Sequence, residues 1–448
     1  MPSRQPASRP AGPAPGSPGP RAGPSDGGMR RVATAAFAGT AIEFYDFYLY
    51  GIAAALVLNT AFFPNLSPVN GTLAALSTYA VAFVARPVGS VLFGHFGDRV
   101  GRKSVLVASL LLMGLSTVAI GLLPDYHSWG VWAPVLLVSL RLLQGIGLGG
   151  EWGGAALLAV EHAPHGRRGF YGAFPQLGPA VGFVGASGAF LVLSAVLDDA
   201  AFAAWGWRVP FVASIVLVGI GLYVRLKVSE TPVFARAMAH REVSRAPVTE
   251  VLREHPREIL LGCGGMTAAY LLFYTATTYC LAYGTTALGI SRDTMLVASL
   301  AAVAFLVAGT WLSAVASDRY GRRPLILAGS AAAAGWGLLL FPLLDTRAPV
   351  LVLLALGGTL FLSGVVYGPM GAYLPELFPT GVRYSGASLA YNLGGILGGA
   401  LPPILATRLQ TSFGSFAVGW YVTAMALLSL WCVLRLPETR GRTLHQQP

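Results

Sequence analysis

The amino-acid sequence predicts an all-α membrane protein with twelve transmembrane helices in two pseudo-symmetric six-helix bundles. The first reason is composition, since the chain is 54% hydrophobic and only 11% charged, whereas soluble domains average roughly 25% charged residues. The second is that apolar runs of roughly 20 residues, the length that a helix needs to cross a bilayer, recur along the chain. The third is a basic loop motif that occurs once in each half of the sequence, which indicates two related halves.

The apolar runs define the individual helices. Glycine is abundant, with 56 residues, and lies inside these runs. Bilayer helices tolerate this because small residues let backbones approach closely. We expect spans near residues 32–58, 72–97, 104–124, 132–160, 170–196, 207–226, 258–286, 294–316, 324–344, 349–374, 384–408 and 414–435.

The polar segments divide the chain into domains. Residues 1–28 are rich in Pro, Gly, Ala, Ser and Arg, and we expect a disordered N-terminal tail because such a composition cannot build a core. Residues 29–226 and 258–436 form the two bundles, a charged cytoplasmic linker spans 227–257, and 437–448 form a cytoplasmic tail. The alternating charge of the linker suits a solvated or interfacial helix.

Basic residues indicate the orientation. Arginines and lysines gather in the linker, near both ends of the chain and in alternate loops, whereas Asp125, Asp198 and Asp199 mark the opposite loops. By the positive-inside rule we expect both termini and the linker to be cytoplasmic, in a multi-pass protein of the plasma (inner) membrane. This sorting explains the net charge of +11, so we expect membrane lipid and no nucleic acid as a partner.

The repeated loop motif is the strongest local signal. It occurs as Gly94-His-Phe-Gly97-Asp98-Arg99-Val-Gly101-Arg102-Lys103 and again as Ser317-Asp318-Arg319-Tyr-Gly321-Arg322-Arg323, with 220 positions between the two aspartates. Glycine permits a tight turn, and the aspartate can lock bases and a helix N-terminus across a cytoplasmic gate. A merely topogenic basic loop is the alternative. The candidate gate residues are Gly94, Gly97, Asp98, Arg99, Gly101, Arg102, Lys103, Asp318, Arg319, Gly321, Arg322 and Arg383.

Five ionisable residues lie well inside the predicted spans, namely Glu43, Asp46, Arg86, Arg141 and Glu151. A charge there is costly unless it is paired or hydrated, so each is a functional candidate. Glu43 and Asp46 share one helical face near mid-membrane, and with Glu151 they are the candidate proton carriers. Arg86 and Arg141 can bind a substrate carboxylate bidentately. The alternative is that acids and arginines are permanent structural partners.

The second half offers hydroxyls and an amide in place of charges. No charged residue lies between Ile259 and Arg292. Tyr270 and Tyr274 share a helical face, and together with Asn392 they are candidate substrate contacts. We expect the first half to couple ion movement to transport, while the hydroxyls and the amide of the second half orient the substrate. Aromatic residues that merely fill helix contacts are the alternative.

Taken together, the motifs resemble the metabolite:proton symporter family of the major facilitator superfamily, and within it the shikimate permease branch. The resemblance covers nearly all of residues 30–440, implies the major facilitator fold and a gate role for the two loops, and adds Tyr45, Gln144 and Gln176 to the candidate substrate contacts. It is carried by Glu43-Phe-Tyr-Asp46, Arg86-Pro-Val-Gly89, Arg141-Leu-Leu-Gln144, Gly150-Glu151-Trp152, Gln176-Leu-Gly178 and Trp205-Gly-Trp-Arg208.

The expected function is secondary active transport, with proton-coupled symport of a small organic acid or zwitterionic metabolite by alternating access between the halves. An uncoupled facilitator or an antiporter is the alternative. The sequence contains no nucleophile–base constellation, phosphate-binding glycine loop or metal-ligand cluster, so we expect no enzyme activity, no cofactor and no metal. We expect the chain to act as a monomer.

Overall fold

The computed structural model describes residues 26–442 except 101, 165, 228–246 and 380–381. Some further side chains, including those of residues 94–106, are also outside the description. The expected N-terminal tail, most of the linker and the end of the C-terminal tail therefore lie largely outside the described residues. Every regular element in the described part of the chain is a helix.

The first half contains six long helical paths joined by short turns. Small helices α2 (Leu58–Phe62), α5 (Tyr126–Trp129) and α9 (Asp199–Ala204) lie in the loops at one end. The long helices are α1 (Asp26–Leu56), α3 (Pro68–Val100), α4 (Arg102–Leu122), α6 (Trp132–Gly149) continued by α7 (Trp152–His162), α8 (Arg168–Val196) and α10 (Val209–Lys227).

The second half repeats this arrangement, after a short helix α12 (Pro247–Glu254) in the linker. Its six paths are α13 (Pro256–Tyr274) continued by η2 (Thr275–Tyr279) and α14 (Cys280–Thr286), α15 (Arg292–Tyr320), α16 (Arg322–Asp345), α17 (Pro349–Glu376), α18 (Arg383–Gly395) continued by η3 (Ile396–Ala400) and α19 (Leu401–Phe413), and α20 (Ser415–Leu434).

These twelve paths confirm the predicted spans. Ten of them are long and apolar enough to cross a membrane over their described residues, and Val107–Leu122 of α4 is a shorter apolar helix. The outer faces carry large apolar side chains, such as Val196 at 75% exposure and Val350 at 77%. Such faces suit lipid, because a water-soluble protein rarely exposes so large an apolar surface.

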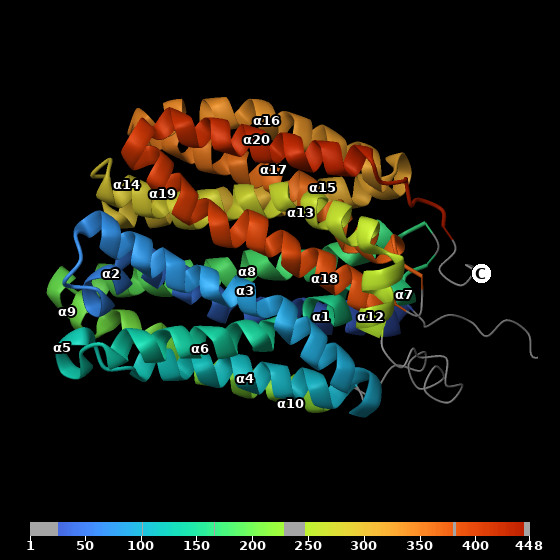
Figure 1. Ribbon diagram of the computed structural model, residues 1–448, viewed down its shortest axis with the longest axis horizontal. Helices are drawn as coiled ribbons and strands as arrows, with labels where there is room; N and C mark the ends of the chain where they lie inside the picture. The colour runs from blue at the N-terminus through green and yellow to red at the C-terminus, as the bar shows by residue number, and fades with distance from the viewer. Residues whose placement is uncertain (1–25, 101, 165, 228–246, 380–381, 443–448) are drawn as a thin grey trace, which may run out of the picture.

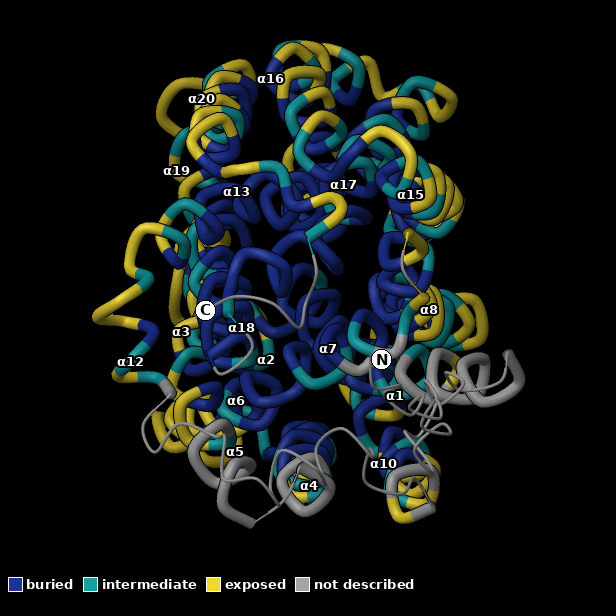
Figure 2. The backbone as a smooth tube through the Cα atoms, turned by 90° about the vertical axis from the view of Figure 1, so that its right-hand side faces the viewer, coloured by how far each residue is buried: buried dark blue, intermediate teal, exposed yellow. Residues whose placement is uncertain are grey.

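The two halves lie side by side. In Figure 1 the helices from α1 to α10 fill the lower part of the molecule and those from α13 to α20 the upper part. The end view in Figure 2 shows buried backbone along the centre, with exposed residues at the periphery. Contacts between α8 and α15, and between α3 and α18, join the halves.

Two π-helical turns interrupt the second half at equivalent places in its first and fifth paths. η2 follows Tyr274 directly, and η3 follows Gly395. π-turns inside α-helices occur frequently at functional sites. A Cβ at Gly399 of η3 would lie 2.5 Å from the ring of Phe83 and 3.0 Å from that of Tyr274. The missing side chain therefore lets η3 pack closely against Phe83 of α3 and Tyr274 of α13.

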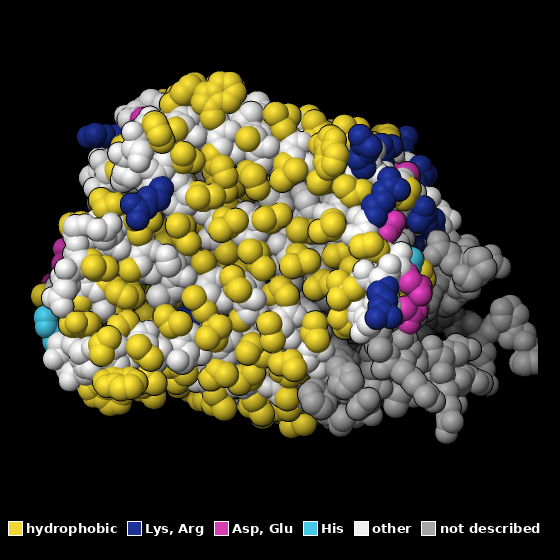
Figure 3. Space-filling view, viewed as in Figure 1, with side chains coloured by type: hydrophobic (Ala, Val, Ile, Leu, Met, Phe, Trp, Pro, Cys, Tyr) yellow, Lys and Arg dark blue, Asp and Glu magenta, His cyan; other side chains and the backbone are white. Residues whose placement is uncertain are grey.

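Charge divides the two ends of the molecule. The helices α8, α16 and α18 begin with an arginine at the end that carries the C-terminal residues. Figure 3 shows Lys and Arg side chains gathered at this end while apolar side chains cover the flank. We call this end the basic end. Its described arginines include Arg168, Arg257, Arg322, Arg383 and Arg435.

Candidate functional site

A cavity lies between the two halves, with about 370 Å³ of space not filled by protein atoms, part of which is open to solvent. Its walls come from α1 and α8 of the first half and from α13, α15, α17 and α18 of the second. Phe44 and Tyr48 are four residues apart on α1 and so face it together. Tyr270, Phe273 and Tyr274 of α13 line the other side. Two of the predicted contacts, Tyr270 and Tyr274, therefore reach this space.

Gln176, a third predicted contact, also lines the cavity, but its amide is already bonded. Its Nε2 donates to the carbonyl oxygen of Tyr367 at 3.0 Å, and its Oε1 accepts from Trp152 Nε1 at 3.0 Å. The indole of Trp152 stacks on the ring of Tyr391, with 3.8 Å between ring centroids. Trp152 and Gln176 belong to the first half and the two tyrosines to the second, so this cluster joins the halves.

The remaining polar groups of the cavity are the hydroxyls of Ser363 and of five tyrosines, Tyr48, Tyr270, Tyr274, Tyr367 and Tyr391. The hydroxyl of Ser363 donates to the carbonyl oxygen of Ala269 at 2.8 Å. The hydroxyls of Tyr367 and Tyr391 lie 3.3 Å apart. The hydroxyl of Tyr270 is buried and has no hydrogen-bond partner among the described residues. The described lining is thus mostly apolar, and the Tyr270 hydroxyl is an unsatisfied donor at its wall.

Arg86 lies beside this wall and is 1% exposed. A Cβ at Gly149 of α6 would collide with the carbonyl oxygen of Arg86, so the glycine permits the close packing that places this part of α3. The guanidinium carbon lies 4.2 Å from the ring centroid of Phe47 and 4.3 Å from that of Phe83. These two rings hold the guanidinium by cation–π contact.

No described carboxylate pairs with Arg86. Its Nε and Nη2 have no hydrogen-bond partner within the described residues, and its nearest ionisable neighbours include Tyr274, Tyr270 and Tyr391. A Cβ at Gly395 would lie 3.5 Å from Tyr270 Cζ and 3.7 Å from Arg86 Nη1. The guanidinium is therefore next to the cavity wall with unused donors.

Arg141 is fully buried inside the first bundle and does not line the cavity. Its Nη1 donates to Gln144 Oε1, and its Nη2 donates to the carbonyl oxygen of Tyr79 at 3.3 Å. The guanidinium carbon lies 3.8 Å from the ring centroid of Tyr50. Gln144 Nε2 in turn donates to Thr117 Oγ1 at 2.7 Å. In this conformation Arg141 and Gln144 satisfy each other instead of facing the cavity.

The contacts that run from Arg141 through Gln144 to Thr117 end beside Asp46, which is 0% exposed. Its nearest polar neighbours are the hydroxyls of Thr117 and Ser214, whose protons are given to the carbonyl oxygens of Met113 at 3.0 Å and Phe211 at 2.7 Å. Neither carboxyl oxygen of Asp46 has a hydrogen-bond partner in the described part of the chain. An ionised carboxylate is costly in such surroundings.

The other two predicted proton carriers are also buried. Glu43 is 2% exposed and lies close enough to Asp46 for the two charges to interact. Glu151 is 4% exposed and occupies the break between α6 and α7, directly before Trp152. Neither lines the cavity.

Two predicted substrate contacts lie elsewhere. The ring of Tyr45 packs on α8, where a Cβ at Gly185 would lie 3.0 Å from it. Asn392 Nδ2 donates to Ser90 Oγ at 2.7 Å and to the carbonyl oxygen of Gly149 at 3.3 Å. Asn392 thus joins α18 to the first half without lining the cavity. Conversely, Phe44 and Tyr48 line the cavity although the sequence did not identify them as contacts. Their spacing of four residues, which places both on one helical face, is the signal that could have indicated them.

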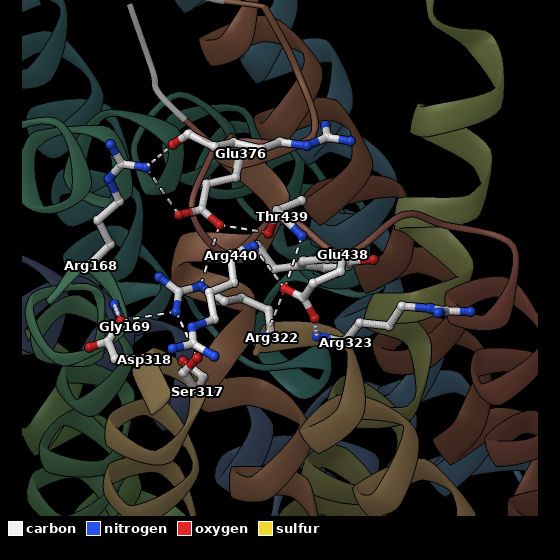
Figure 4. A network of polar contacts seen from close by, with 12 residues as sticks. Arg168, Gly169, Ser317, Asp318, Arg322, Arg323, Glu376, Glu438, Thr439 and Arg440 are labelled. Atoms are coloured by element: carbon white, nitrogen blue, oxygen red, sulfur yellow. Dashed lines mark hydrogen bonds and ion pairs between the residues drawn. The ribbon is translucent and has the colours of Figure 1, made fainter. Parts of the chain in front are cut away.

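A polar network closes the basic end, and Figure 4 shows its members converging from both halves. Asp318, at the end of α15, accepts from the backbone N–H groups of Gly169 at 2.8 Å and Phe170 at 2.9 Å. These are the first orphan donors of α8, so an aspartate of the second half caps a helix of the first. Arg322 Nη1 lies 3.0 Å from the same carboxylate.

Glu376, at the end of α17, extends the network. Its carboxylate lies 3.6 Å from Arg168 of the first half and 3.4 Å from Arg322 of the second. Thr439, in the segment after α20, donates its hydroxyl to the same carboxylate at 2.6 Å. The side chain of Glu376 is 1% exposed, so these partners offset the cost of burying its charge.

The turn between α15 and α16 depends on glycine and on the C-terminal segment. Gly321 has φ +99°, and a Cβ there would lie 2.7 Å from Glu438 Oε2. Glu438 accepts from the backbone N–H groups of Arg322 at 3.0 Å and Arg323 at 2.9 Å, which caps α16. Only a residue without a side chain suits both the positive φ and the neighbouring carboxylate.

The other predicted gate residues do not all join this network. Arg319 is exposed and lies over the ring of Tyr320 instead of joining the network. Arg383 lies 3.6 Å from Glu161, across the two halves. The first motif copy ends α3 and begins α4. Gly101 and the side chains of the others, Gly94, Gly97, Asp98, Arg99, Arg102 and Lys103, lie outside the described residues.

A smaller contact joins the halves at the opposite end. Arg292, at the start of α15, lies 2.9 Å from Asp199 of α9 and donates its Nε to Ser194 Oγ at 2.8 Å. Ser194 also hydrogen-bonds to Asp293. Arg292 is partly exposed and packs over the ring of Phe202. The cavity therefore lies between two sets of contacts, one at each end.

Comparisons with known proteins agree with this architecture. A family model described as Sugar (and other) transporter matches residues 32–258 and 237–448. The chain is 49% identical over 419 residues to the inner membrane metabolite transport protein YhjE of Escherichia coli (strain K12), covering 92% of this chain and 95% of that protein. It is 38% identical over 431 residues to the shikimate transporter of the same organism, with 92% and 95% covered.

Solved structures show the same fold. The xylose transporter XylE from E. coli, in a partially occluded inward-open conformation, matches with a TM-score of 0.74 at 21% identity, over 93% of this chain and 99% of that one. The relatives are transport proteins, which confirms the prediction of a transporter and not an enzyme. The predicted resemblance is confirmed as well: this chain belongs to the sugar (and other) transporter family, within the major facilitator superfamily of membrane transporters.

Proposed function

We propose that this transporter is a proton-coupled symporter of a small organic acid or zwitterionic metabolite in the inner membrane. The observation that carries the proposal is that two buried groups of opposite charge, Asp46 inside the first bundle and Arg86 beside the cavity, are not paired among the described residues. Within the part of the chain that the structure describes, the buried carboxyl of Asp46 has no hydrogen-bond donor, and the buried guanidinium of Arg86 has no carboxylate partner. A proton neutralises Asp46, and the carboxylate of the substrate neutralises Arg86.

The chain of contacts between Asp46 and Arg141 offers a route for coupling. Thr117 and Gln144 lie between the two groups, and Gln144 holds Arg141 in its present place. When Asp46 carries a proton, Arg141 stays with Gln144. When Asp46 loses the proton, its charge draws the guanidinium toward α1. Glu43 and Glu151 remain the other candidate carriers.

Alternating access follows from the contacts at the two ends. Opening toward the basic end requires Asp318 to release α8 and Glu376 to release Arg168. Opening the opposite end requires Arg292 to leave Asp199. When the two halves rock about the central cavity, the contacts at one end break while those at the other end form.

The orientation and domain limits belong to the same proposal. The arginines of the basic end favour a cytoplasmic position for that end by the positive-inside rule, with both termini on that side. The bundles comprise residues 29–226 and 258–436, the linker 227–257 and the tails 1–28 and 437–448. Each chain carries a complete cavity, which supports a monomer that needs only lipid around it.

Uptake into proteoliposomes tests the proposal against an uncoupled facilitator or antiporter. Purified protein is reconstituted, and a panel of labelled organic acids and zwitterions is offered with and without a pH gradient that is acidic outside. A symporter accumulates its substrate above the outside concentration only with the gradient. Equal uptake in both conditions would favour the uncoupled alternative. Protein-free vesicles correct for passive entry of protonated acids.

A further inference from the structure

The chemistry of the cavity walls narrows the class of substrate, given the transport role proposed above. Phe44, Phe273 and Met266 present apolar surface to it. The polar groups of Gln176 and Ser363 are bonded to other protein groups, as described above. A ligand with several hydroxyls would lose hydrogen bonds to water here and find few replacements. The walls therefore fit a hydrocarbon body.

Two side chains beside the wall have donors without a partner among the described residues, and these donors indicate the other part of the ligand. Arg86 offers Nε and Nη2, and Tyr270 offers its hydroxyl. Both side chains are more than nine-tenths buried. Buried donors without partners are rare in folded proteins. The guanidinium contacts the rings of Phe47 and Phe83, and its adjacent Nε and Nη2 can bind a carboxylate bidentately.

The described lining of the cavity offers an ammonium group aromatic rings but no carboxylate. No acidic side chain lines it in the described part of the chain, and the positive Arg86 lies beside its wall. An amino acid or a betaine would bring its cation close to this guanidinium. A single negative charge is compensated there, whereas a zwitterion leaves its positive group unpaired.

We infer that the cavity binds a small monocarboxylate with an unsubstituted hydrocarbon body, such as a planar or saturated ring, and rejects sugars, polyhydroxylated acids and zwitterions. The carboxylate contacts Arg86 and the hydroxyl of Tyr270. The hydrocarbon body lies against Phe44, Tyr48 and Phe273. This assignment separates the chain from the shikimate and xylose transporters to which it is similar, because both named substrates carry several hydroxyls.

Ligand binding to the purified full-length chain in detergent tests this assignment without any gradient. The probes are benzoate, shikimate, benzamide and glycine betaine, and the measurement is the rise of the thermal unfolding midpoint over a concentration series, which yields apparent dissociation constants. Benzoate and benzamide differ in charge. Benzoate and shikimate both carry one carboxylate on a six-membered ring and differ chiefly in hydroxyls.

We expect benzoate to bind about 100-fold more tightly than shikimate, the discrimination that an apolar pocket achieves against added hydroxyls. Benzamide and glycine betaine should bind more weakly than benzoate by at least about tenfold, since each lacks a net charge for the guanidinium. Arg86→Gln should abolish the difference between benzoate and benzamide. Arg408→Gln, an exposed arginine on α19, is the matched control and should preserve it.

Several results would overturn the assignment. These are tighter or equal binding of shikimate or glycine betaine, no binding of benzoate by the wild type, or an Arg86→Gln variant that still prefers benzoate to benzamide. The wild-type comparison needs no variant, so a folding defect cannot obscure the result. Because binding is measured without a pH gradient, failure of proton coupling would leave this result unchanged, and the two proposals can fail separately.

Discussion

Replacing Asp318 by asparagine should shift the transporter toward the state that is open at the basic end. The carboxylate caps α8 of the other half through two backbone N–H groups, at 2.8 and 2.9 Å, and pairs with Arg322 at 3.0 Å. It is 12% exposed, so water screens these contacts little. The asparagine side chain keeps one acceptor oxygen but loses the negative charge and the second acceptor oxygen.

The size of the shift can be worked from these contacts. A hydrogen bond to a charged group contributes about 1.5–3 kcal/mol, and the charge at a helix N-terminus adds up to about 1 kcal/mol. Because the amide retains part of the cap, we take a loss of about 1.5 kcal/mol. Since 1.4 kcal/mol corresponds to a factor of ten in an equilibrium constant, the ratio of open to closed molecules at the basic end should rise roughly tenfold.

Double electron–electron resonance measures this ratio directly. Spin labels on Pro164→Cys and Arg435→Cys, which are exposed positions in the first and second half, report the separation of the halves at the basic end. The native cysteines are buried. The matched control is Asp345→Asn, which also removes a charged acceptor of two side-chain hydrogen bonds, to Tyr283 and Ser415, but within one half. An unchanged distance distribution in Asp318→Asn, or an equal change in the control, would refute the reasoning.

Three further variants test other contacts. Arg86→Lys keeps the charge but loses the planar fork, so the half-saturation concentration of a carboxylate substrate should rise about tenfold; an unchanged value would indicate a structural arginine. Arg292→Gln removes a partly exposed ion pair to Asp199, which contributes about 0.2–1 kcal/mol. Spin labels at the end opposite the basic end should therefore report at most about a fivefold gain of the open state. A larger gain would mean that this contact dominates closure. Gly321→Ala should lower the thermal unfolding midpoint, because φ +99° strains any side chain by about 1–3 kcal/mol and the methyl group meets Glu438; an unchanged midpoint would show that the turn relaxes freely.

The sequence predicts the architecture well because the bilayer simplifies the problem. Each span must be apolar and about 20 residues long, so length and hydropathy alone locate the helices. The basic loop motif, repeated with an offset of 220 positions, identifies the two halves. These signals are local in the chain, and the structure confirms the fold that they imply.

The site is harder to predict because several helices here are apolar on all sides. On α1, Phe44 and Tyr48 face the cavity while the adjacent Tyr45 packs on α8. Nothing in the local sequence states which of these faces meets the second half. Hydrophobic periodicity normally orients a helix, but it vanishes when one side meets lipid and the other side protein.

Partners from distant parts of the chain are the second difficulty. The motif predicts that Asp318 binds bases and a helix N-terminus, yet it does not identify α8, 148 residues away in the chain, as that helix. Arg86 and Arg141 look equivalent in the sequence. In the structure one adjoins the cavity, and the other bonds to Gln144 inside the first bundle.

The most direct test of the central claim, proton-coupled transport through a buried carboxyl of α1, compares wild type with Asp46→Asn in proteoliposomes. Two quantities are measured for the same labelled substrate: accumulation driven by a pH gradient, and counterflow exchange without one. We predict that wild type does both, and that Asp46→Asn exchanges substrate but no longer accumulates it, because binding and rocking do not require net proton movement. A wild type that ignores the gradient, or an Asp46→Asn variant that still accumulates substrate, would contradict the account.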